Sequence, residues 1–569
     1  MKATVFAFLT LAATVGAGAV HAEDAAGAWA GTIDDHMAVL VHIDKAADGY
    51  TGRFEAHEEP VSRPDPKAFS SVVETLSATP DHLVFAVPVV GGHFDAHWDA
   101  TKKAWAGTFQ WGPGGNVSQI TMRRTTAATF ADLPRPPPRP DGTADIAKMD
   151  EVVRAYAAND QFMGTVLVSK HGKVVFDKAY GYADLEWQTP MTTDAKLRIG
   201  SMTKQFTAAA ILLLEERGKL KTDDLIKTYL PDAPASWQKI TIHNLLTHTS
   251  GLPNYTAQPG FQALMRQAST PKDVIALFRD KPLDFEPDTN WAYSNSNYFL
   301  LGLIIEKVSG QTYADFLKTN ILTPLHMDAT GYDINAEVLS HRALGYAPGM
   351  HGLENAGFVD MTTPYSAGAM YSTTHDLLTW ENALYGGRVL SAASLKKMTA
   401  PYKAGYGYGL FIHSEDGRAT IEHGGNINGF NSEMAHYPDD DVNIIVLDNI
   451  EGATASVMHN ALLRLAHGET VTVPAVRKEV HVDRTILQSY VGTYELSPAF
   501  SIAFTLEGDQ LVSQATGQGK LPVFAQSNTL FFAKAVDAQI EFFKDDKGKV
   551  AYLILHQGGR DVKGVRKQD

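Results

Sequence analysis

A proline-rich run constrains the fold of this 569-residue chain most strongly. Residues 133–140 read Leu-Pro-Arg-Pro-Pro-Pro-Arg-Pro, a composition that favours an extended polyproline conformation. Proline lacks the amide hydrogen that helices and central strands need, so the run is excluded from the interior of either element. We therefore expect a linker over residues 126–144, with separately folded parts on its two sides.

The segment before the linker, residues 23–125, has the pattern of a small all-β domain. Short strand-like runs recur at residues 39–43 and 83–87, and glycines at 91–92 and 112–115 supply turns between such runs. A small barrel or sandwich is the expected architecture. Residues 480–569 return to the same kind of pattern, and we expect a second small β-barrel domain there.

Residues 145–470, between these two β domains, mix helical and strand patterns. Strand-like runs at 165–168 and 174–176 begin this segment, another at 443–447 lies near its end, and helical runs separate them. We expect one antiparallel sheet, built from the two ends of the segment and covered by helices. The predicted fold class is therefore multidomain, with a central α/β (α+β) domain flanked by two barrel-like β domains.

The first 22 residues have the pattern of a secretory signal. Lys2 precedes a short apolar stretch that ends near Val20 and Ala22, so we expect cleavage after Ala22. The mature protein is then expected to be periplasmic or secreted, with no transmembrane span. An uncleaved membrane anchor is the alternative. The absence of cysteine excludes disulfides, a thiol nucleophile and thiolate metal sites.

The charge of the chain restricts its partners. With a formal net charge of -15, nucleic acid is not an expected partner. The oligomeric state stays open.

Residues 200–204, Gly-Ser-Met-Thr-Lys, directly precede a long apolar helical run. Ser201 and Lys204 stand three residues apart, so on a helix their side chains share one face. A desolvated lysine with a lowered pKa can accept the proton of a serine hydroxyl. The pattern predicts an acyl-transfer nucleophile with its base attached. The same spacing recurs at Ser236–Lys239, Ser269–Lys272 and Ser394–Lys397. We interpret these copies as a loop, a helix cap and a second helix cap.

Tyr293 and Asn295 offer a phenol and an amide to the same site. We expect a nearby cation to lower the pKa of Tyr293, so that its phenolate can act as a general base. The Asn295 amide can hold the lysine or a substrate carbonyl. The alternative interpretation is a buried tyrosine followed by a capping asparagine.

The run His423-Gly424-Gly425-Asn426 follows a strand-like segment. Glycine there lets a substrate backbone approach closely, and a backbone amide of this run can join that of Ser201 in an oxyanion hole. His423 is expected to face a substrate carboxylate or the leaving group. A glycine turn with a surface histidine is the alternative.

In order and setting, these segments resemble the serine β-lactamase and penicillin-binding-protein family, most closely the branch of class C β-lactamases, D,D-carboxypeptidases, D-aminopeptidases and related esterases. The family motifs Ser-x-x-Lys, Tyr-x-Asn and Lys/His-x-Gly correspond to Ser201–Lys204, Tyr293–Asn295 and His423–Gly425. Residues 245–253 and 366–372 also resemble stretches of this family. The resemblance implies a β-lactamase/transpeptidase-like central domain, and the C-terminal domain resembles β-barrel modules appended to such hydrolases.

The resemblance implies a serine hydrolase that works through an acyl-enzyme, without a metal or cofactor. Its expected partner is a small-molecule or short-peptide substrate, with peptidoglycan-derived compounds, esters and β-lactams as the options. Ser201 would attack a carbonyl while Lys204 and Tyr293 shuttle protons. Asn295 would orient the lysine or the substrate amide. The backbone amides of Ser201 and Asn426 would form the oxyanion hole.

Class C β-lactamases usually carry lysine where His423 stands, which favours D,D-carboxypeptidase, D-aminopeptidase or esterase activity over β-lactamase activity. A class C-like β-lactamase and, in another class, a non-catalytic cell-wall or penicillin-binding protein stay open. The sequence contains no Gly-x-Ser and no His-Glu-x-x-His, which argues against an α/β-hydrolase and a metallohydrolase. We interpret His248 as a structural loop histidine rather than a metal ligand.

Overall fold

The computed structural model describes residues 25–567 apart from 34–36, 47–48, 59–68, 80, 89–91, 111–116, 127–141, 350–351, 416–417, 498–499, 535–537 and 558–559. The expected signal, most of the expected linker and the turns at Gly91 and 112–115 therefore lie outside the described residues. The chain divides into two units, residues 1–137 with 414–417, and residues 138–413 with 418–569. No helix among the described residues is long and apolar enough to cross a membrane.

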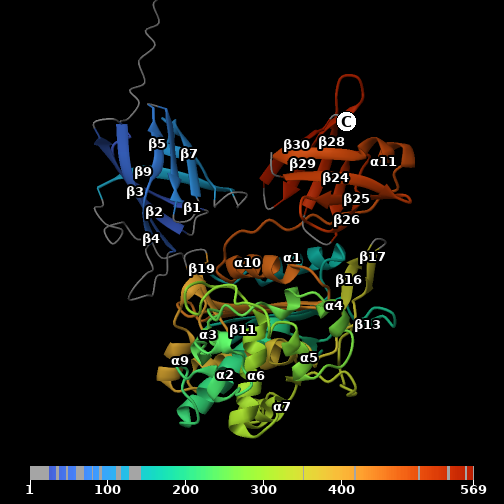
Figure 1. The fold of residues 1–569 in the computed structure, drawn as a ribbon. Helices are drawn as coiled ribbons and strands as arrows, with labels where there is room; N and C mark the ends of the chain where they lie inside the picture. The colour runs from blue at the N-terminus through green and yellow to red at the C-terminus, as the bar shows by residue number, and fades with distance from the viewer. Residues whose placement is uncertain are drawn as a thin grey trace, which may run out of the picture. The chain divides into compact units, whose positions relative to one another are not determined.

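The first unit is a single nine-stranded antiparallel sheet, which confirms the expected all-β N-terminal domain (Figure 1). Its strands are β1 Gly27–Ile33, β2 Met37–Ala46, β3 Gly49–Glu58, β4 Phe69–Val72, β5 Glu74–Ala78, β6 His82–Val87, β7 Gly92–Asp99, β8 Ala104–Gln110 and β9 Val117–Thr125. Their order is β4-β3-β2-β1-β9-β8-β7-β6-β5. Trp29 and Trp105 pack edge to face at 6.1 Å in its core.

The central domain is built on a six-stranded sheet of order β11-β10-β22-β21-β20-β19. Its strands are β10 Gly164–Lys170, β11 Lys173–Tyr180, β19 Phe411–Glu415, β20 Arg418–Ile427, β21 Phe430–Tyr437 and β22 Val442–Asp448. Strand β10 pairs with β22 from Gly164↔Asp448 to Lys170↔Val442. The prediction that the two ends of the domain share one sheet is therefore confirmed.

Helices cover both faces of this sheet (Figure 1). Because side chains alternate along a strand, Val166 and Val168 of β10 pack against α1 Ile146–Ala158 and α10 Thr454–Ala466. Leu167, on the opposite face, joins the core that contains α2 Thr203–Glu216 and α6 Asn295–Ser309. The other helices are α3 Ile242–Leu246, α4 Phe261–Leu264, α5 Pro271–Ala276, α7 Tyr313–Leu317, α8 Thr374–Tyr385 and α9 Ala392–Met398.

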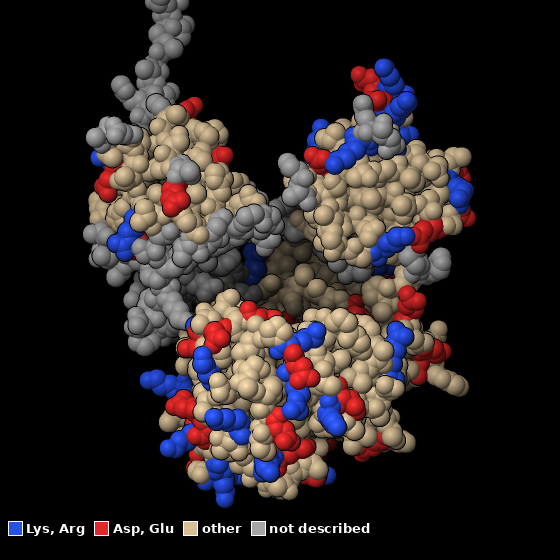
Figure 2. All heavy atoms as spheres, viewed as in Figure 1, with Lys and Arg blue, Asp and Glu red and all other residues tan. Residues whose placement is uncertain are grey.

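Short strands complete the central domain. They are β12 Tyr182–Asp184, β13 Thr189–Pro190, β14 Leu197–Arg198, β15 Gly331–Tyr332, β16 Tyr346–Gly349, β17 Gly352–Asn355 and β18 Met370–Ser372. Strand β18 pairs with both β14 and β15 in a small sheet next to the candidate site. On the face of the central domain seen in Figure 2, acidic and basic side chains are intermixed, so this face does not present a field of one sign.

The C-terminal domain is a closed eight-stranded barrel, as expected from its sequence pattern. Its elements are α11 Arg484–Tyr490, β23 Gly492–Ser497, β24 Phe500–Glu507, β25 Gln510–Ala515, β26 Lys520–Ala525, β27 Leu530–Ala533, β28 Ala538–Lys544, β29 Val550–Gln557 and β30 Arg560–Arg566. Strands β23 and β30 pair to close the barrel, which removes its open edges. Tyr490 of α11 stacks on the barrel residue Phe542 at 4.1 Å.

Candidate active site

Ser201 lies in a single 3-10 turn, Gly200–Met202, which leads directly into α2. Gly200 has a φ of +48°, and a Cβ there would lie 3.0 Å from the backbone nitrogen of Asn426. A left-handed backbone against a neighbouring strand favours glycine. The Ile199 amide donates to the Met370 carbonyl at 3.0 Å and ties the turn to β18. The serine is therefore presented on a turn that is fixed on two sides.

Lys204 is fully buried in the first turn of α2. Its Nζ lies 2.9 Å from Ser201 Oγ, 2.9 Å from Asn295 Oδ1 and 2.8 Å from the Ala367 carbonyl. Burial lowers the pKa of Lys204 well below its ordinary value. A neutral amine has two hydrogens, and the amide and carbonyl oxygens only accept, so its lone pair is left for the Ser201 hydroxyl. This arrangement suits a general base.

Tyr293 lies beside this pair, with Lys204 Nζ 4.9 Å from its ring centroid. Burial raises the pKa of Tyr293 above its ordinary value, and a hydrogen bond with Ser201 offsets only part of that rise. The prediction that a neighbouring cation lowers this pKa is therefore wrong. Desolvation disfavours both the phenolate of Tyr293 and the ammonium form of Lys204, so burial favours a neutral phenol beside a neutral amine.

Asn295 begins α6, and its side chain orients the lysine. Its backbone amide donates to Asn254 Oδ1 at 3.1 Å, which fixes the start of the helix. Asn254 follows directly after residues 245–253, a stretch singled out in the sequence, but no motif marks this asparagine as part of the site. Of the two partners expected for the Asn295 amide, the structure shows the lysine.

Gly425 and Asn426 lie on β20, which passes close to the Ser201 turn. A Cβ on Gly425 would lie only 2.0 Å from the Ile199 carbonyl oxygen, so a side chain cannot be placed there without moving one of the two segments. The Asn426 backbone nitrogen faces Gly200 across the same gap. The structure thus brings β20 against the turn that carries Ser201, as an oxyanion hole made by these two backbone segments requires.

His423 is buried in β20, so the alternative of a surface histidine is wrong. Its Nδ1 lies 2.6 Å from the Gly424 carbonyl, and its Nε2 lies 3.1 Å from the Tyr406 hydroxyl. Because a carbonyl only accepts, Nδ1 carries the hydrogen and Nε2 accepts from Tyr406. Burial, together with Lys204, lowers the pKa of His423 to about 3. The ring is neutral and bonded within the protein, and its role towards a substrate stays a prediction.

His248, interpreted from the sequence as a loop histidine, packs against the site. Its ring centroid lies 4.4 Å from that of Tyr293 and 4.7 Å from that of Tyr406. Its Nδ1 accepts from the Ser294 amide at 3.3 Å and from Asn297 Nδ2 at 3.0 Å. Burial lowers the pKa of His248 well below its ordinary value. The residue is structural, as expected, and it supports the segment that carries Tyr293.

The other Ser-x-x-Lys copies are structural in the described chain. Lys239 pairs with an exposed glutamate, Glu286, at 3.1 Å. Helix α5 is capped by Thr270 and not by Ser269, because Thr270 forms a capping box with Asp273. Helix α9 is likewise capped by Ser391, which places Ser394 inside the helix. Both cap predictions are therefore wrong: the cap of α5 lies one residue after Ser269, and the cap of α9 lies three residues before Ser394. The two predicted helices are present.

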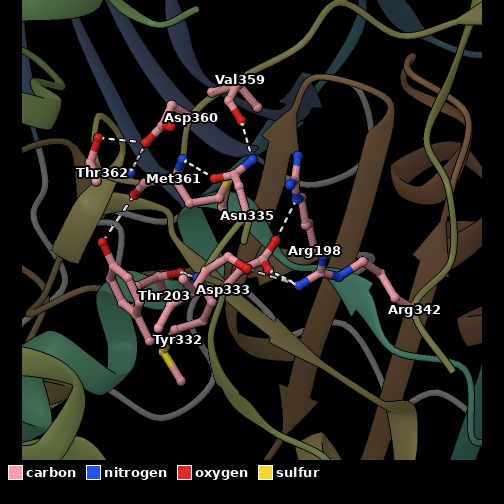
Figure 3. A network of polar contacts seen from close by, with 12 residues as sticks. Arg198, Thr203, Tyr332, Asp333, Asn335, Arg342, Val359, Asp360, Met361 and Thr362 are labelled. Atoms are coloured by element: carbon pink, nitrogen blue, oxygen red, sulfur yellow. Dashed lines mark hydrogen bonds and ion pairs between the residues drawn. The ribbon is translucent and has the colours of Figure 1, made fainter. Parts of the chain in front are cut away.

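A buried ion-pair network, which the sequence did not reveal, borders the serine turn (Figure 3). Asp333 is 1% exposed, and its carboxylate lies 2.7 Å from Arg198 Nε and 2.7 Å from Arg342 NH2. Arg198 ends β14, shortly before Ser201, and the Asp333 amide donates to the Ala369 carbonyl at 2.7 Å. The network therefore ties together the small β14-β18-β15 sheet from which the Ser201 turn emerges.

Comparisons with known proteins match both parts of the second unit. Residues 149–469 match the Beta-lactamase family, and residues 476–566 match a domain of unknown function, DUF3471. The chain is 32% identical over 435 residues to "Penicillin-binding protein 4*" of Bacillus subtilis (strain 168), covering 71% of this chain and 95% of that protein. It is 30% identical over 332 residues to the D-aminopeptidase of Brucella anthropi, covering 55% of this chain and 61% of that protein.

The chain is also similar to solved structures of a penicillin-binding-protein homologue and a D-amino acid amidase. The octameric penicillin-binding protein homologue from Pyrococcus abyssi is 26% identical with a TM-score of 0.53, over 74% of this chain and all (100%) of that one. The D-amino acid amidase from Ochrobactrum anthropi SV3, solved with L-phenylalanine amide, is 25% identical with a TM-score of 0.50, over 57% of this chain and 97% of that one.

Proposed function

The chain belongs to the Beta-lactamase family, and on this premise we propose that it is a serine hydrolase that forms an acyl-enzyme on Ser201. One observation carries the proposal: the Lys204 amine is buried, and it lies 2.9 Å from the Ser201 hydroxyl with two pure acceptors as its other partners. A buried amine with a lowered pKa, held on the nucleophile, is what activation of serine requires.

In acylation, Ser201 Oγ attacks the substrate carbonyl carbon and its proton passes to Lys204 Nζ. The ammonium that forms is held by Asn295 Oδ1 and the Ala367 carbonyl. The carbonyl oxygen becomes negative and accepts hydrogen bonds from the backbone amides of Ser201 and Asn426. No ionised carboxylate is needed for this step.

Tyr293 is the proposed proton donor to the leaving group. Because burial keeps its phenol protonated, it can give that proton to the departing nitrogen or oxygen while Lys204 returns a proton to the phenolate. Water then attacks the acyl-enzyme while Lys204 Nζ accepts a proton from it. When the bond between the acyl carbon and Ser201 Oγ breaks, Lys204 returns that proton to Oγ, and the acid product leaves. The opposite directions of their pKa shifts support Lys204 as the base and Tyr293 as the acid.

The proposed substrates are small amides or peptides with a D-residue next to the scissile bond, or short esters, ahead of β-lactams. Support comes from the likeness to a D-aminopeptidase and a D-amino acid amidase. It also comes from His423, which is a neutral ring in this structure where class C β-lactamases usually have a cation.

A substrate panel tests the proposal: a peptide ending in D-Ala-D-Ala, D-amino-acid amides with their L-counterparts, short p-nitrophenyl esters and nitrocefin. We expect hydrolysis of amides or esters and slow nitrocefin turnover, all lost in Ser201→Ala and retained in Ser394→Ala. Fast turnover of nitrocefin alone would indicate a β-lactamase. Failure of fluorescent penicillin and of a fluorophosphonate to label Ser201 would instead indicate a non-catalytic protein.

We also propose export to the periplasm or medium, supported by the signal-like pattern of residues 1–22. Cell fractionation and N-terminal sequencing of the expressed protein test this. A mature N-terminus at Glu23 is expected, and a cytoplasmic protein that retains Met1 would contradict it.

A further inference from the structure

The N-terminal β domain carries a group of potential metal ligands that the catalytic proposal does not use. His82 on β6 and His97 on β7 are directly opposite partners in the antiparallel register. Asp95 stands two residues before His97, so its side chain lies on the same face of the sheet. One ligand atom from each of the three residues lies within 4.8 Å of the others. We propose that these residues form a binding site for a divalent transition-metal ion, with Zn²⁺ as the favoured one.

The spacing of the three groups is close to that of a bound ion. His82 Nε2 lies 2.7 Å from Asp95 Oδ1, and the His82 and His97 rings stack with centroids 4.4 Å apart and planes 9° from parallel. Ligand atoms at about 2.0–2.2 Å from a tetrahedral Zn²⁺ lie about 3.3 Å from one another. The ion would take the place of the hydrogen atom between His82 Nε2 and Asp95 Oδ1. Because the two stacked rings are nearly parallel, one imidazole must turn out of the stack before both can point a nitrogen at the same ion.

The scaffold holds the ligand strands while leaving the ligands room to turn. Along β6 and β7, alternate residues are buried: Leu83 and Phe85 from β6, Phe94 and Ala96 from β7. These side chains anchor the opposite face of the sheet in its core. The His82 and Asp95 side chains are 38% and 46% exposed, so both can adjust to a ligand. The register of β6 and β7 therefore holds the backbones of the three residues close together without an ion.

The chemistry of the ligand set selects the class of ion. Two imidazoles and one carboxylate suit Zn²⁺, Ni²⁺ or Cu²⁺, whereas Ca²⁺ and Mg²⁺ favour oxygen ligands only. Three protein ligands leave at least one position for water or a further ligand. Without an ion, the same residues form a surface hydrogen bond and a ring stack. Metal titration separates these two states.

Isothermal titration of the untagged full chain, freed of metal by a chelator, with Zn²⁺ tests the proposal. We expect one saturable site, weakened about 10- to 100-fold or more in His82→Asn and in His97→Asn. The matched control is His93→Asn, because His93 is an exposed histidine of β7 on the same face and outside the cluster.

Two outcomes would overturn the proposal: no saturable binding of Zn²⁺, or binding that His82→Asn and His97→Asn leave unchanged. A loss in His93→Asn equal to that in the two cluster variants would contradict the ligand set. If the variants unfold, the wild-type chain still decides the matter, because Zn²⁺ at a native site must raise the unfolding temperature of the N-terminal domain and Mg²⁺ must not. Ester or amide turnover by Ser201 is a separate readout and is expected to be the same in all three variants.

Discussion

The close approach of β20 to the Ser201 turn makes Gly425→Ala a severe test of the proposed oxyanion hole. The new Cβ would lie 2.0 Å from the Ile199 carbonyl oxygen and 2.5 Å from Ser432 Oγ, whereas ordinary contact begins at 3.4 Å. Either β20 or the turn must therefore move by about 1.4 Å, the difference between these two separations. The Ser432 hydroxyl can rotate away, but the Ile199 carbonyl is part of the backbone just before the nucleophile.

A displacement of that size is large on the scale of catalysis. A misplacement of about 1 Å can cost on the order of 10²-fold in rate, and loss of one oxyanion donor costs about 10²–10³-fold. We therefore expect kcat/KM of Gly425→Ala to fall about 10²-fold or more, equivalent to roughly 2.7 kcal/mol of transition-state stabilisation. Overpacking should also reduce the free energy of unfolding by about 1–3 kcal/mol.

Steady-state hydrolysis of the best ester or amide, with thermal unfolding measured on the same samples, checks this prediction. Gly424→Ala is the matched control, because its Cβ points to the other face of β20 and meets the Glu433 carboxylate at 2.8 Å, the far end of a flexible side chain. We expect the control to lose less than about 10-fold, since the Glu433 carboxylate must shift but the backbone Ser432 carbonyl oxygen, at 3.3 Å, hardly has to move. Near wild-type activity in Gly425→Ala, or equal losses in both variants, would refute the reasoning.

Three further predictions concern the groups around Ser201. Lys204→Met should lower turnover by about 10²–10⁴-fold without lowering the unfolding temperature, because it removes a general base that is also a buried amine; kinetics and thermal melts check both. In the wild type, kcat/KM should rise with pH through the lowered pKa of Lys204. The free energy of unfolding should also rise with pH between that lowered pKa and about 10.4, because in this window the unfolded lysine binds a proton that the folded amine lacks; urea unfolding at several pH values should show a weaker slope in Lys204→Met. Asp333→Asn should cost about 3 kcal/mol of stability by leaving Arg198 and Arg342 without their counter-charge, and Arg342→Lys, which keeps a cation, should cost less by denaturant unfolding.

Site residues could be predicted from the sequence where they stand close together in the chain or belong to a specific motif. Ser201 and Lys204 share a helical face, and the Tyr-x-Asn and His-x-Gly runs mark their own segments, so these residues could be named before the fold was known. The sheet shared by β10 and β22 was equally accessible, because long apolar runs at both ends of a domain predict buried strands.

The features that the sequence did not predict correctly all depend on the three-dimensional surroundings of a residue. Asp333 and Asn254 reach the site only through tertiary contacts, and no local pattern marks them. The pKa of Tyr293 was predicted in the wrong direction because spacing reveals a neighbouring lysine but not the desolvation that neutralises both groups. Near the starts of α5 and α9 more than one hydroxyl residue could act as the N-cap. The backbone geometry identifies Thr270 and Ser391 as the capping residues, and the sequence does not contain that information.

The pairing of β10 with β22 also governs when the site can exist during synthesis. The Met163 amide donates to Asp448 Oδ1, a hydrogen bond that joins residues 285 positions apart. Such long-range closure forms late and slowly, because the intervening chain must be ordered first. Ser201 leaves the ribosome well before β20, so the emerging chain carries the nucleophile without the strand that completes its surroundings. Assembly of the proposed active site thus waits for synthesis of the last strands of the central domain.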